Sequence, residues 1–547
     1  MSAFLSTWVG VDDTAHVAVT VTGDAAEAVG VHSPALLADA VASRIAAKDF
    51  TLWGEEAEAE SKIRLGWTEL SQTTRSILPQ LNDLVVAARA EGKTRVVLAG
   101  MGGSSLGPEV ICATYDVPLV TLDSTDPDQV RNALDGDLES TILVVSSKSG
   151  GTVETDSQRR AFEEAFEQAG LDPRQHIVVV TDPGSPLHKA SVDAGYRAVF
   201  LADPNVGGRF SVLSAFGVVP SALAGVPVEE ILDEAAAVAE SFAEDNEANP
   251  ALVLGAAMAG TIGTDKARDK LVFSDLGSGL VGFADWAEQL IAESTGKAGK
   301  GVLPVAAEVN APDASLFDVL DTRLAPLDHE IDEPDNGIVV AGTLGGQFLL
   351  WEYATAIAGR LLGISPFDQP NVESAKVASR ALLDALPEPE PPLFVDNGIE
   401  VRAHNLSLEG VSTVRDAIRA LENTLGERGY VAIMAYLDRE ANPALPSVRS
   451  AIAARTSRPT TFGWGPRFLH STGQLHKGGA PIGVFLQITG TFAEDLDIPQ
   501  RPFTFGQLIS AQAQGDAEVL AEHGRPVLRL NLTDSAQIDA VAAMLKG

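Results

Sequence analysis

Two short stretches rich in glycine, serine and threonine carry residue types that could bind a phosphate group. The first is AGMGGSSLGPEV, residues 99–110, and the second is SSKSGGTVET, residues 146–155. Each follows a β-branched run and precedes a segment with a helical pattern. Such a strand-to-helix turn points backbone N–H groups and the positive end of a helix dipole at one place. Together the stretches predict a phosphate monoester site, although each alone also fits an ordinary tight turn.

The elements that must position these turns are short, β-branched strands separated by room for helices. This alternation predicts a doubly wound parallel sheet. Because neighbouring strands in such a sheet present their carboxyl-end turns to one crevice, we expect both polar stretches at the same crevice. The predicted strands are TRVVLAG (94–100), PLVTLDS (118–124), TILVVSS (141–147), HIVVVTD (176–182) and YRAVFLA (196–202).

A second α/β unit is predicted after the acidic stretch that ends at Pro250, with strands at 270–275, 337–342 and 430–437. The expected fold class is α/β, with two doubly wound parallel-sheet domains built as α/β/α sandwiches and with N-terminal and C-terminal helical extensions. The expected limits are an N-terminal cap at 1–90 with a strand near 17–21, a first domain at 91–245, a second at 246–500 and a C-terminal extension at 501–547.

The composition indicates which kinds of partner the protein is expected to lack and in which cellular compartment it is expected to work. Acidic residues outnumber basic ones by 75 to 39, a formal charge of −36, which argues against nucleic acid or an anionic membrane as a partner. The single cysteine, Cys112, excludes an internal disulfide framework and fits a reducing cytosol. The first residues have no basic region before an apolar one, so no signal peptide is expected. We therefore expect a cytoplasmic protein.

Four further motifs give the chain a family resemblance. With the two polar stretches, they resemble the glucose-6-phosphate isomerase (phosphoglucose isomerase) family of the sugar isomerase, or SIS, fold. The resemblance covers about residues 95 to 480 and is strongest to the divergent bacterial form that also occurs fused to transaldolase. The motifs are VGGRFSVLSAFG (206–217), EQLIAESTGK (288–297), FDQPNVESAK (367–376) and HSTGQLHKGG (470–479).

The resemblance implies an aldose–ketose isomerase that interconverts D-glucose 6-phosphate and D-fructose 6-phosphate through ring opening and a cis-enediol. A carboxylate base, a cation for the enediolate oxygen, an acid for the ring oxygen and a phosphate anchor are enough for this chemistry. No metal or cofactor is implied. The family also implies a homodimer, in which the ring-opening histidine comes from the partner subunit.

Catalytic roles are carried over from the matched motifs. Glu293 is expected to be the base, and it falls in the last turn of a predicted helix, where the helix dipole disfavours a carboxylate. Arg209 is expected to stabilise the enediolate. His470 and Lys376 are expected to act in ring opening, and Gln289 matches a substrate-contacting glutamine.

The phosphate would be bound by the two glycine-rich turns. Gly150 and Gly151 stand where the family usually has an aromatic residue and a threonine, which removes one hydroxyl donor. Lys376 also precedes His470, the reverse of the usual order. The expected phosphate ligands are Gly102, Gly103, Ser104, Ser147, Lys148, Ser149 and Thr152.

Two other functions fit part of the pattern. One is an isomerase of another sugar phosphate, including mannose 6-phosphate, because pocket shape decides tolerance at C2. The other is a non-catalytic SIS sensor of a sugar phosphate. A sensor needs only the phosphate turns, so it does not account for Arg209, Glu293, Lys376 and His470 occurring together.

Overall fold

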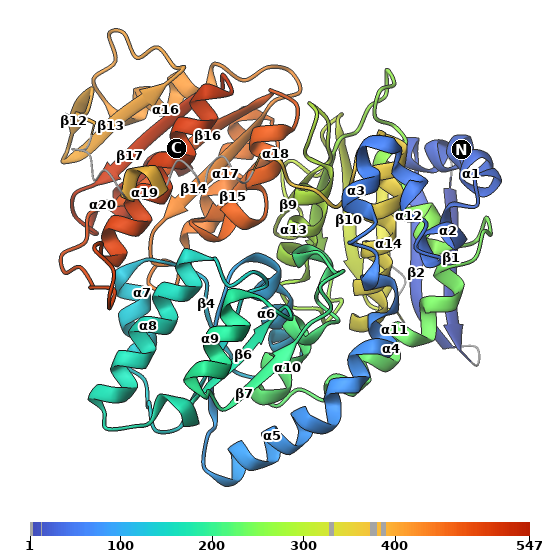
Figure 1. Cartoon of the computed structure of the whole chain (residues 1–547). Helices are drawn as coiled ribbons and strands as arrows, with labels where there is room; N and C mark the ends of the chain where they lie inside the picture. Colours follow the sequence, from blue (N-terminus) through green and yellow to red (C-terminus); the bar gives the residue numbers. More distant parts are fainter. Residues whose placement is uncertain (1–3, 12–13, 328–332, 372–379, 384–389) are drawn as a thin grey trace.

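The computed structural model describes residues 4–11, 14–327, 333–371, 380–383 and 390–547. They form a mixed α/β fold with three sheets (Figure 1). The predicted α/β class with parallel-sheet domains is confirmed. The number of sheets is three rather than two, because the C-terminal part of the chain builds a sheet of its own.

The first sheet contains the five strands predicted between residues 94 and 202. Its order is β4-β3-β5-β6-β7, and every pair is parallel. Alternate residues of the strands face two different hydrophobic cores, so both faces of the sheet are covered. The strands are β3 Arg95–Gly100, β4 Val120–Leu122, β5 Thr141–Ser146, β6 Ile177–Thr181 and β7 Ala198–Leu201.

Helices on both sides of the first sheet follow its strands in the expected alternation. Pro127 and Pro186 stand at the starts of two of them, where the missing N–H has no helical partner to lose. The helices are α5 Leu78–Ala90, α6 Leu106–Thr114, α7 Pro127–Leu134, α8 Val153–Gln168, α9 Pro186–Ala194 and α10 Ala215–Ala224.

The second sheet combines the N-terminal hairpin with four later strands. Its order is β1-β2-β11-β10-β8-β9, and β2 pairs antiparallel with β11. The strand predicted near residues 17–21 is confirmed, and it joins this sheet. The strands are β1 Phe4–Val11, β2 Thr14–Thr22, β8 Lys270–Asp275, β9 Leu303–Ala306, β10 Val319–Ala325 and β11 Gly337–Gly342.

Five main helices accompany the second sheet. Helix α13 lies between β8 and β9 in the chain and is buried along most of its length, so it packs as an internal element. The helices are α1 Asp24–Ala38, α11 Val228–Phe242, α12 Pro250–Ala259, α13 Phe283–Thr295 and α14 Leu344–Leu362.

The third sheet lies in the C-terminal part, in orange and red in Figure 1, with order β12-β13-β17-β16-β14-β15. Strand β14, predicted to belong to the second unit, pairs here with β15 and β16, so that assignment is wrong. The limits at residues 90, 245 and 500 stay predictions. The strands are β12 Phe394–Asp396, β13 Ile399–His404, β14 Tyr430–Tyr436, β15 Thr460–Trp464, β16 Gly483–Gly490 and β17 Val527–Leu532.

The helices of the third unit lie on both faces of its sheet. One face carries a hydrophobic core formed with α16, α17 and α20. Helix α19 packs against the other side and also contributes Phe505 and Leu508 to the core of the first sheet. The helices are α16 Val414–Glu422, α17 Val448–Thr456, α18 Gly473–Gly478, α19 Phe505–Glu522 and α20 Gln537–Lys546.

Candidate active site

The two predicted phosphate turns are neighbours in space. Strands β3 and β5 pair in parallel with Gly100 opposite Ser146, so both turns leave the sheet at the same edge. The chain runs from β3 outward to β4 and then returns to β5 on the other side of β3. This reversal of strand order is the position where open α/β sheets bind ligands.

The second turn leaves the start of α8 without a side-chain cap. The hydroxyl of its N-cap residue, Thr152, lies 3.2 Å from Ser147 Oγ and accepts no bond from the helix. Ser147 Oγ also accepts a hydrogen bond from the Gly150 N–H at 3.2 Å. The first N–H groups of a 16-residue helix therefore stand beside two hydroxyls, an arrangement that suits an anion.

The other predicted phosphate ligands differ in their surroundings. Lys148 Nζ donates to Asp182 Oδ2 at 2.5 Å and to the Pro204 carbonyl at 3.1 Å, so its charge is already paired within the protein. Ser149 is exposed and accepts from the Gly151 N–H, whereas Ser104 is half-buried. Of these three, Ser104 has a side chain that is neither paired to a carboxylate nor turned to solvent.

Glycines let three distant segments meet at the first turn. Gly102 has φ +58°, and a Cβ there would lie 2.8 Å from Gln289 Nε2 and 2.9 Å from the His470 carbonyl oxygen. A Cβ on Gly103 would lie 1.9 Å from the Gly208 carbonyl oxygen. Only glycine lets the backbone approach so closely. The first turn is thus in contact with α13, with the turn before Arg209 and with the segment that ends at His470.

Glu293 lies in the last turn of α13, as predicted, and its carboxylate has two polar neighbours. Arg209 Nη1 lies 3.5 Å from Glu293 Oε1, and Gln289 Nε2 donates to Glu293 Oε2 at 3.2 Å. The Arg209 side chain is 2% exposed and that of Glu293 is 10% exposed. The pair is therefore a carboxylate and a fixed cation held together in nearly dry surroundings.

The two terminal nitrogens of the Arg209 guanidinium differ: Nη2 is hydrogen-bonded within the protein, whereas Nη1 could still donate to a ligand. Nη2 donates to the Phe367 carbonyl at 2.8 Å, the Asp368 carbonyl at 3.2 Å and Gln369 Oε1 at 2.8 Å. Nη1 is buried and has no hydrogen-bond partner within the residues that the structure describes. Burial lowers the pKa of Arg209, an effect that the charge of Glu293 opposes. A ligand oxygen within hydrogen-bond distance of Nη1 would supply the missing acceptor.

His470 reaches this cluster from the third unit. Its carbonyl accepts from Gln289 Nε2 at 2.8 Å, and its Nε2 lies 3.2 Å from Glu154 Oε1. Glu154 Oε1 also accepts from Gln512 Nε2 at 2.7 Å. The carboxylate thus orients the imidazole. Because this histidine belongs to the same chain, its place in the site requires no partner subunit, and the homodimer stays a prediction.

The loop that carries His470 is tied to the first sheet by buried ion pairs. Arg467, three residues earlier, donates through Nε to Asp123 Oδ2 at 2.5 Å and through Nη2 to Glu109. Arg439 also donates to Glu109, at 2.9 Å. Breaking such an ion pair would leave a buried charge without a partner, which is costly. The ion pairs therefore hold the loop in one position.

Lys376 and the second histidine of the HSTGQLHKGG motif, His476, differ from His470 in what the structure shows. Lys376 lies outside the described residues, so its role stays a prediction. His476 is buried, lies 3.0 Å from the Tyr430 hydroxyl through Nδ1, and has its pKa lowered to about 3 by burial. It remains neutral at physiological pH and packs within the third unit, so it is a structural residue and not a proton donor.

Sequence reasoning missed three residues of the cluster. Lys297 Nζ donates to the carbonyl of Asp368 at 2.5 Å and to its Oδ1 at 2.7 Å, and burial lowers the pKa of Lys297 to about 8. Lys297 is the last residue of the motif at 288–297, and Glu154 lies within the second glycine-rich stretch at 146–155, so both had a local signal. Gln512 had none, because it stands in the middle of an ordinary amphipathic helix.

Comparison with known proteins agrees with this geometry. The phosphoglucose isomerase family model matches residues 83–311. The chain is 31% identical over 372 residues to the glucose-6-phosphate isomerase of Rubrobacter xylanophilus, an alignment that covers 55% of this chain and 85% of that protein. The chain belongs to the phosphoglucose isomerase family. It is also 32% identical to the probable glucose-6-phosphate isomerase of Natronomonas pharaonis, covering 60% of this chain and 87% of that one.

Solved structures resemble the fold of this family member. A hypothetical protein from Thermus thermophilus superposes with a TM-score of 0.54 and 26% identity over 65% of this chain and 96% of that one. The glucose-6-phosphate isomerase of Chlamydia trachomatis gives a TM-score of 0.53 at 19% identity over 70% of this chain and 90% of that one. The second likeness concerns the fold alone.

Proposed function

We propose that this protein is a glucose-6-phosphate isomerase that interconverts D-glucose 6-phosphate and D-fructose 6-phosphate. The observation that carries the proposal is the buried pair of Glu293 and Arg209, in which Nη1 of the arginine lacks a hydrogen-bond acceptor among the described residues and lies 3.5 Å from the carboxylate. An acceptor that appears as an enediolate forms would fill this gap, which stabilises a transition state more than a ground state.

Ring opening is the first step, and it needs a proton at the ring oxygen and removal of one from the C1 hydroxyl of the aldose. We assign this exchange to His470, with Lys376 as its partner. The carboxylate of Glu154 supports the assignment, because its contact with Nε2 at 3.2 Å fixes the orientation of the imidazole.

Proton transfer between C2 and C1 follows on the open chain. Glu293 removes the C2 proton of the aldose, and the electron pair moves to the carbonyl oxygen at C1, which Arg209 stabilises. A proton then passes from the C2 hydroxyl to the C1 oxygen, so that the C2 oxygen becomes the ketone carbonyl as Glu293 returns its proton to C1. A base that only shuttles one proton is kept close to both carbons, and Gln289 keeps the carboxylate in place through its 3.2 Å hydrogen bond.

The phosphate of the substrate is assigned to the two turns at the edge of the first sheet. Ser147, Thr152 and the N-terminus of α8 supply its donors, with Ser104 and the backbone of Gly102 and Gly103 on the other side. Ser149 stays a candidate. Because Lys148 is paired with Asp182, it contributes positive electrostatic potential near the phosphate but offers no unpaired ammonium group.

The assembly and location of the enzyme are further proposals. None of the helices in the described ranges is long and apolar enough to cross a membrane. A cytoplasmic homodimer that acts on a hexose 6-phosphate, with no nucleic-acid or membrane partner, fits the acidic composition and the family. The predicted limits at residues 90, 245 and 500 are kept as proposed unit boundaries.

The test is the conversion of fructose 6-phosphate to glucose 6-phosphate by the purified protein after EDTA treatment. Turnover that survives EDTA would support the metal-free enediol reaction. Mannose 6-phosphate offered in parallel would measure tolerance at C2. Binding of fructose 6-phosphate without turnover would contradict the proposal and favour the sensor.

A further inference from the structure

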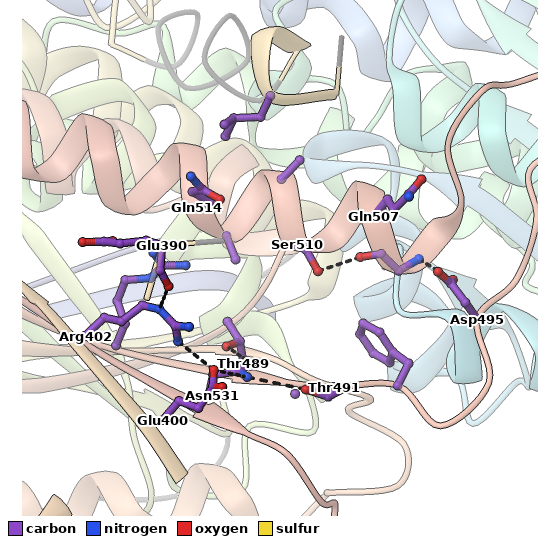
Figure 2. Close-up of a pocket in the computed structure, with 17 residues that line it drawn as sticks. Glu390, Glu400, Arg402, Thr489, Thr491, Asp495, Gln507, Ser510, Gln514 and Asn531 are labelled. Atoms are coloured by element: carbon purple, nitrogen blue, oxygen red, sulfur yellow. Dashed lines mark hydrogen bonds and ion pairs between the residues drawn. The ribbon is translucent and has the colours of Figure 1, made fainter. Parts of the chain in front are cut away.

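A second polar cavity lies between α19 and the third sheet, and none of its lining residues belongs to the catalytic cluster. Its volume is about 660 Å³, which is within the range of small-molecule sites. Figure 2 shows Gln507, Ser510 and Gln514 of α19 on one side, facing Thr489 and Asn531 on the strands. We refer to this cavity as the α19 groove.

Arg529 of β17 is the unusual charge in the α19 groove. Its Nε donates to Gln487 Oε1 at 2.8 Å, but within the described part of the chain neither Nη1 nor Nη2 has a hydrogen-bond partner. Arg402 stands opposite Arg529 in the β13–β17 register and is paired with Glu400 at 2.9 Å. Like charges on facing strands destabilise a sheet. An anion bound to Arg529 would remove that cost.

The charge of the groove limits what this anion can be. Its lining contains two guanidinium groups, Arg402 and Arg529, and three carboxylates, Glu390, Glu400 and Asp495. Because the lining has one more carboxylate than guanidinium groups, the groove disfavours a doubly charged anion such as a phosphate monoester. A single carboxylate group is the better match, because a guanidinium can bind it with two parallel hydrogen bonds.

The uncharged lining favours a ligand with hydroxyl groups. Thr489 Oγ1 donates to Asn531 Oδ1 at 2.9 Å, and Ser510 Oγ donates to the Gly506 carbonyl at 2.7 Å. Asn531 Nδ2 donates to Glu400 at 3.1 Å. These donors are already used inside the protein, whereas the hydroxyl oxygens can still accept. A ligand that donates O–H groups would use them.

We propose that the α19 groove binds a small polyhydroxy carboxylate, of the class of the sugar acids, with its carboxylate on Arg529. Its hydroxyl groups would donate to Thr489, Ser510 and Gln514, which line the groove together with Arg529.

Helix α19 also connects the groove to the catalytic cluster. Arg529 donates to Gln487, and Gln487 donates to the Ala513 carbonyl of α19 at 2.8 Å. The preceding residue, Gln512, donates to Glu154, the carboxylate beside His470. We infer that occupancy of the groove changes the ring-opening step through α19. This coupling rests on the proposed function, whereas binding in the groove does not.

Calorimetric titration of the full chain with D-gluconate tests the binding site. D-sorbitol, which has the hydroxyl groups without the charge, and inorganic phosphate are the comparison probes. We expect gluconate to bind the wild type, and Arg529→Met to weaken that binding roughly tenfold to a hundredfold, the loss typical of hydrogen bonds to a charged group. Arg458→Met is the matched control, since Arg458 is half-buried, donates only to carbonyl oxygens among the described residues and lies outside the groove.

Equal gluconate affinity in Arg529→Met and wild type would overturn the site. So would phosphate binding that Arg529→Met abolishes, because the site would then select a phosphate and not a carboxylate. Sorbitol binding as tight as that of gluconate would also overturn it, since the charge would then contribute nothing.

Initial rates with gluconate at saturating fructose 6-phosphate test the coupling. A rate change that persists at saturation and disappears in Arg529→Met would support it. Inhibition that substrate relieves and Arg529→Met retains would place gluconate in the catalytic crevice and contradict the proposal. Binding with unchanged rates would support the site and overturn the coupling. If the wild type does not turn over, the proposed function fails, but the titration still decides the site.

Discussion

The proposed catalytic cluster and the α19 groove each contain an arginine whose guanidinium has N–H groups without a hydrogen-bond partner among the described residues. In the cluster, Arg209 is 2% exposed, and the segments around it touch one another through glycine. In the groove, Arg529 stands in an open cavity whose other polar groups bond mainly among themselves. The two sites therefore differ in exposure, which agrees with the proposal that the first carries out chemistry and the second binds a ligand.

The physical reason lies in the surroundings of the charges. A nearly dry cluster strengthens electrostatic interactions and spares the reorganisation of water during reaction. In the cluster, Gly102 and Gly103 lie close to three distant segments, and the side chains of Arg209 and Glu293 are almost fully buried. Among its described residues, the groove has no comparable set of close backbone contacts, so its charged side chains remain partly solvated. We therefore expect the groove to contribute binding affinity and coupling rather than chemistry. Four predictions test this contrast.

Glu293→Gln should produce the largest effect. The amide keeps the hydrogen bond to Gln289 or an equivalent one but cannot accept the substrate proton, so kcat should fall about 100- to 10,000-fold with little change in KM. Steady-state rates with fructose 6-phosphate measure this. A variant with normal thermal unfolding and near wild-type kcat would show that another residue is the base.

Gly103→Ala should disrupt the close contact between the turn at Gly103 and the turn at Gly208. The new Cβ would lie 1.9 Å from the Gly208 carbonyl oxygen, so one of the two turns must move. A displacement of about 1 Å costs on the order of 100-fold in rate, and overpacking costs about 1–3 kcal/mol of stability. Activity assays and urea denaturation measure both losses.

Gly208→Ala is the matched control for that change, because a Cβ at Gly208 meets no described atom within 4 Å. We expect its loss of rate and of stability to be clearly smaller than that of Gly103→Ala. Equal losses would mean that the close approach of these two turns is not what the site depends on.

Glu154→Gln should affect ring opening more than proton transfer. The amide removes the charge beside His470, and loss of a charge-assisted hydrogen bond corresponds to roughly 10- to 100-fold. NMR can follow anomer exchange of glucose 6-phosphate, which reports ring opening alone. Glu293→Gln should retain this exchange while Glu154→Gln slows it. Equal anomer exchange in both variants and the wild type would contradict the role given to His470.

Lys297 should give the smallest effect, visible as a pH dependence. Burial lowers its pKa from 10.5 to about 8, so the unfolded chain binds more protons than the folded one between these values. Unfolding free energy should therefore rise as pH increases from about 8 to 10.5, relative to Lys297→Met. Below pH 8 the buried ammonium destabilises the wild type, and Lys297→Met should be the more stable protein.

The activity of Lys297 variants provides a separate measurement. Loss of its proton weakens the interaction with Asp368, whose carbonyl also anchors Arg209. We expect kcat/KM of the wild type to decline a few-fold above pH 8, and Lys297→Arg to move this decline to higher pH. An identical pH profile in Lys297→Arg would show that the lysine has no part in positioning Arg209.

The sequence by itself determined the local elements and the chemistry they carry. All five strands of the first sheet, both glycine-rich turns and the place of Glu293 at the end of α13 follow from short-range patterns. These features depend on neighbours within a few residues, such as β-branched runs, glycines and helix ends. The motifs around Arg209 and His470 were likewise visible as residue types, without any knowledge of their contacts.

Only the tertiary structure decided which segments meet. The third sheet was missed because a buried strand such as β14 has the same apolar pattern whichever sheet it joins. His470 and Glu154 are 316 residues apart in sequence, and Gln512 is 358 residues from Glu154. No local periodicity encodes such pairs, since they arise from the packing of whole units against each other. That packing brings the proposed base, its cation and the histidine together within one chain.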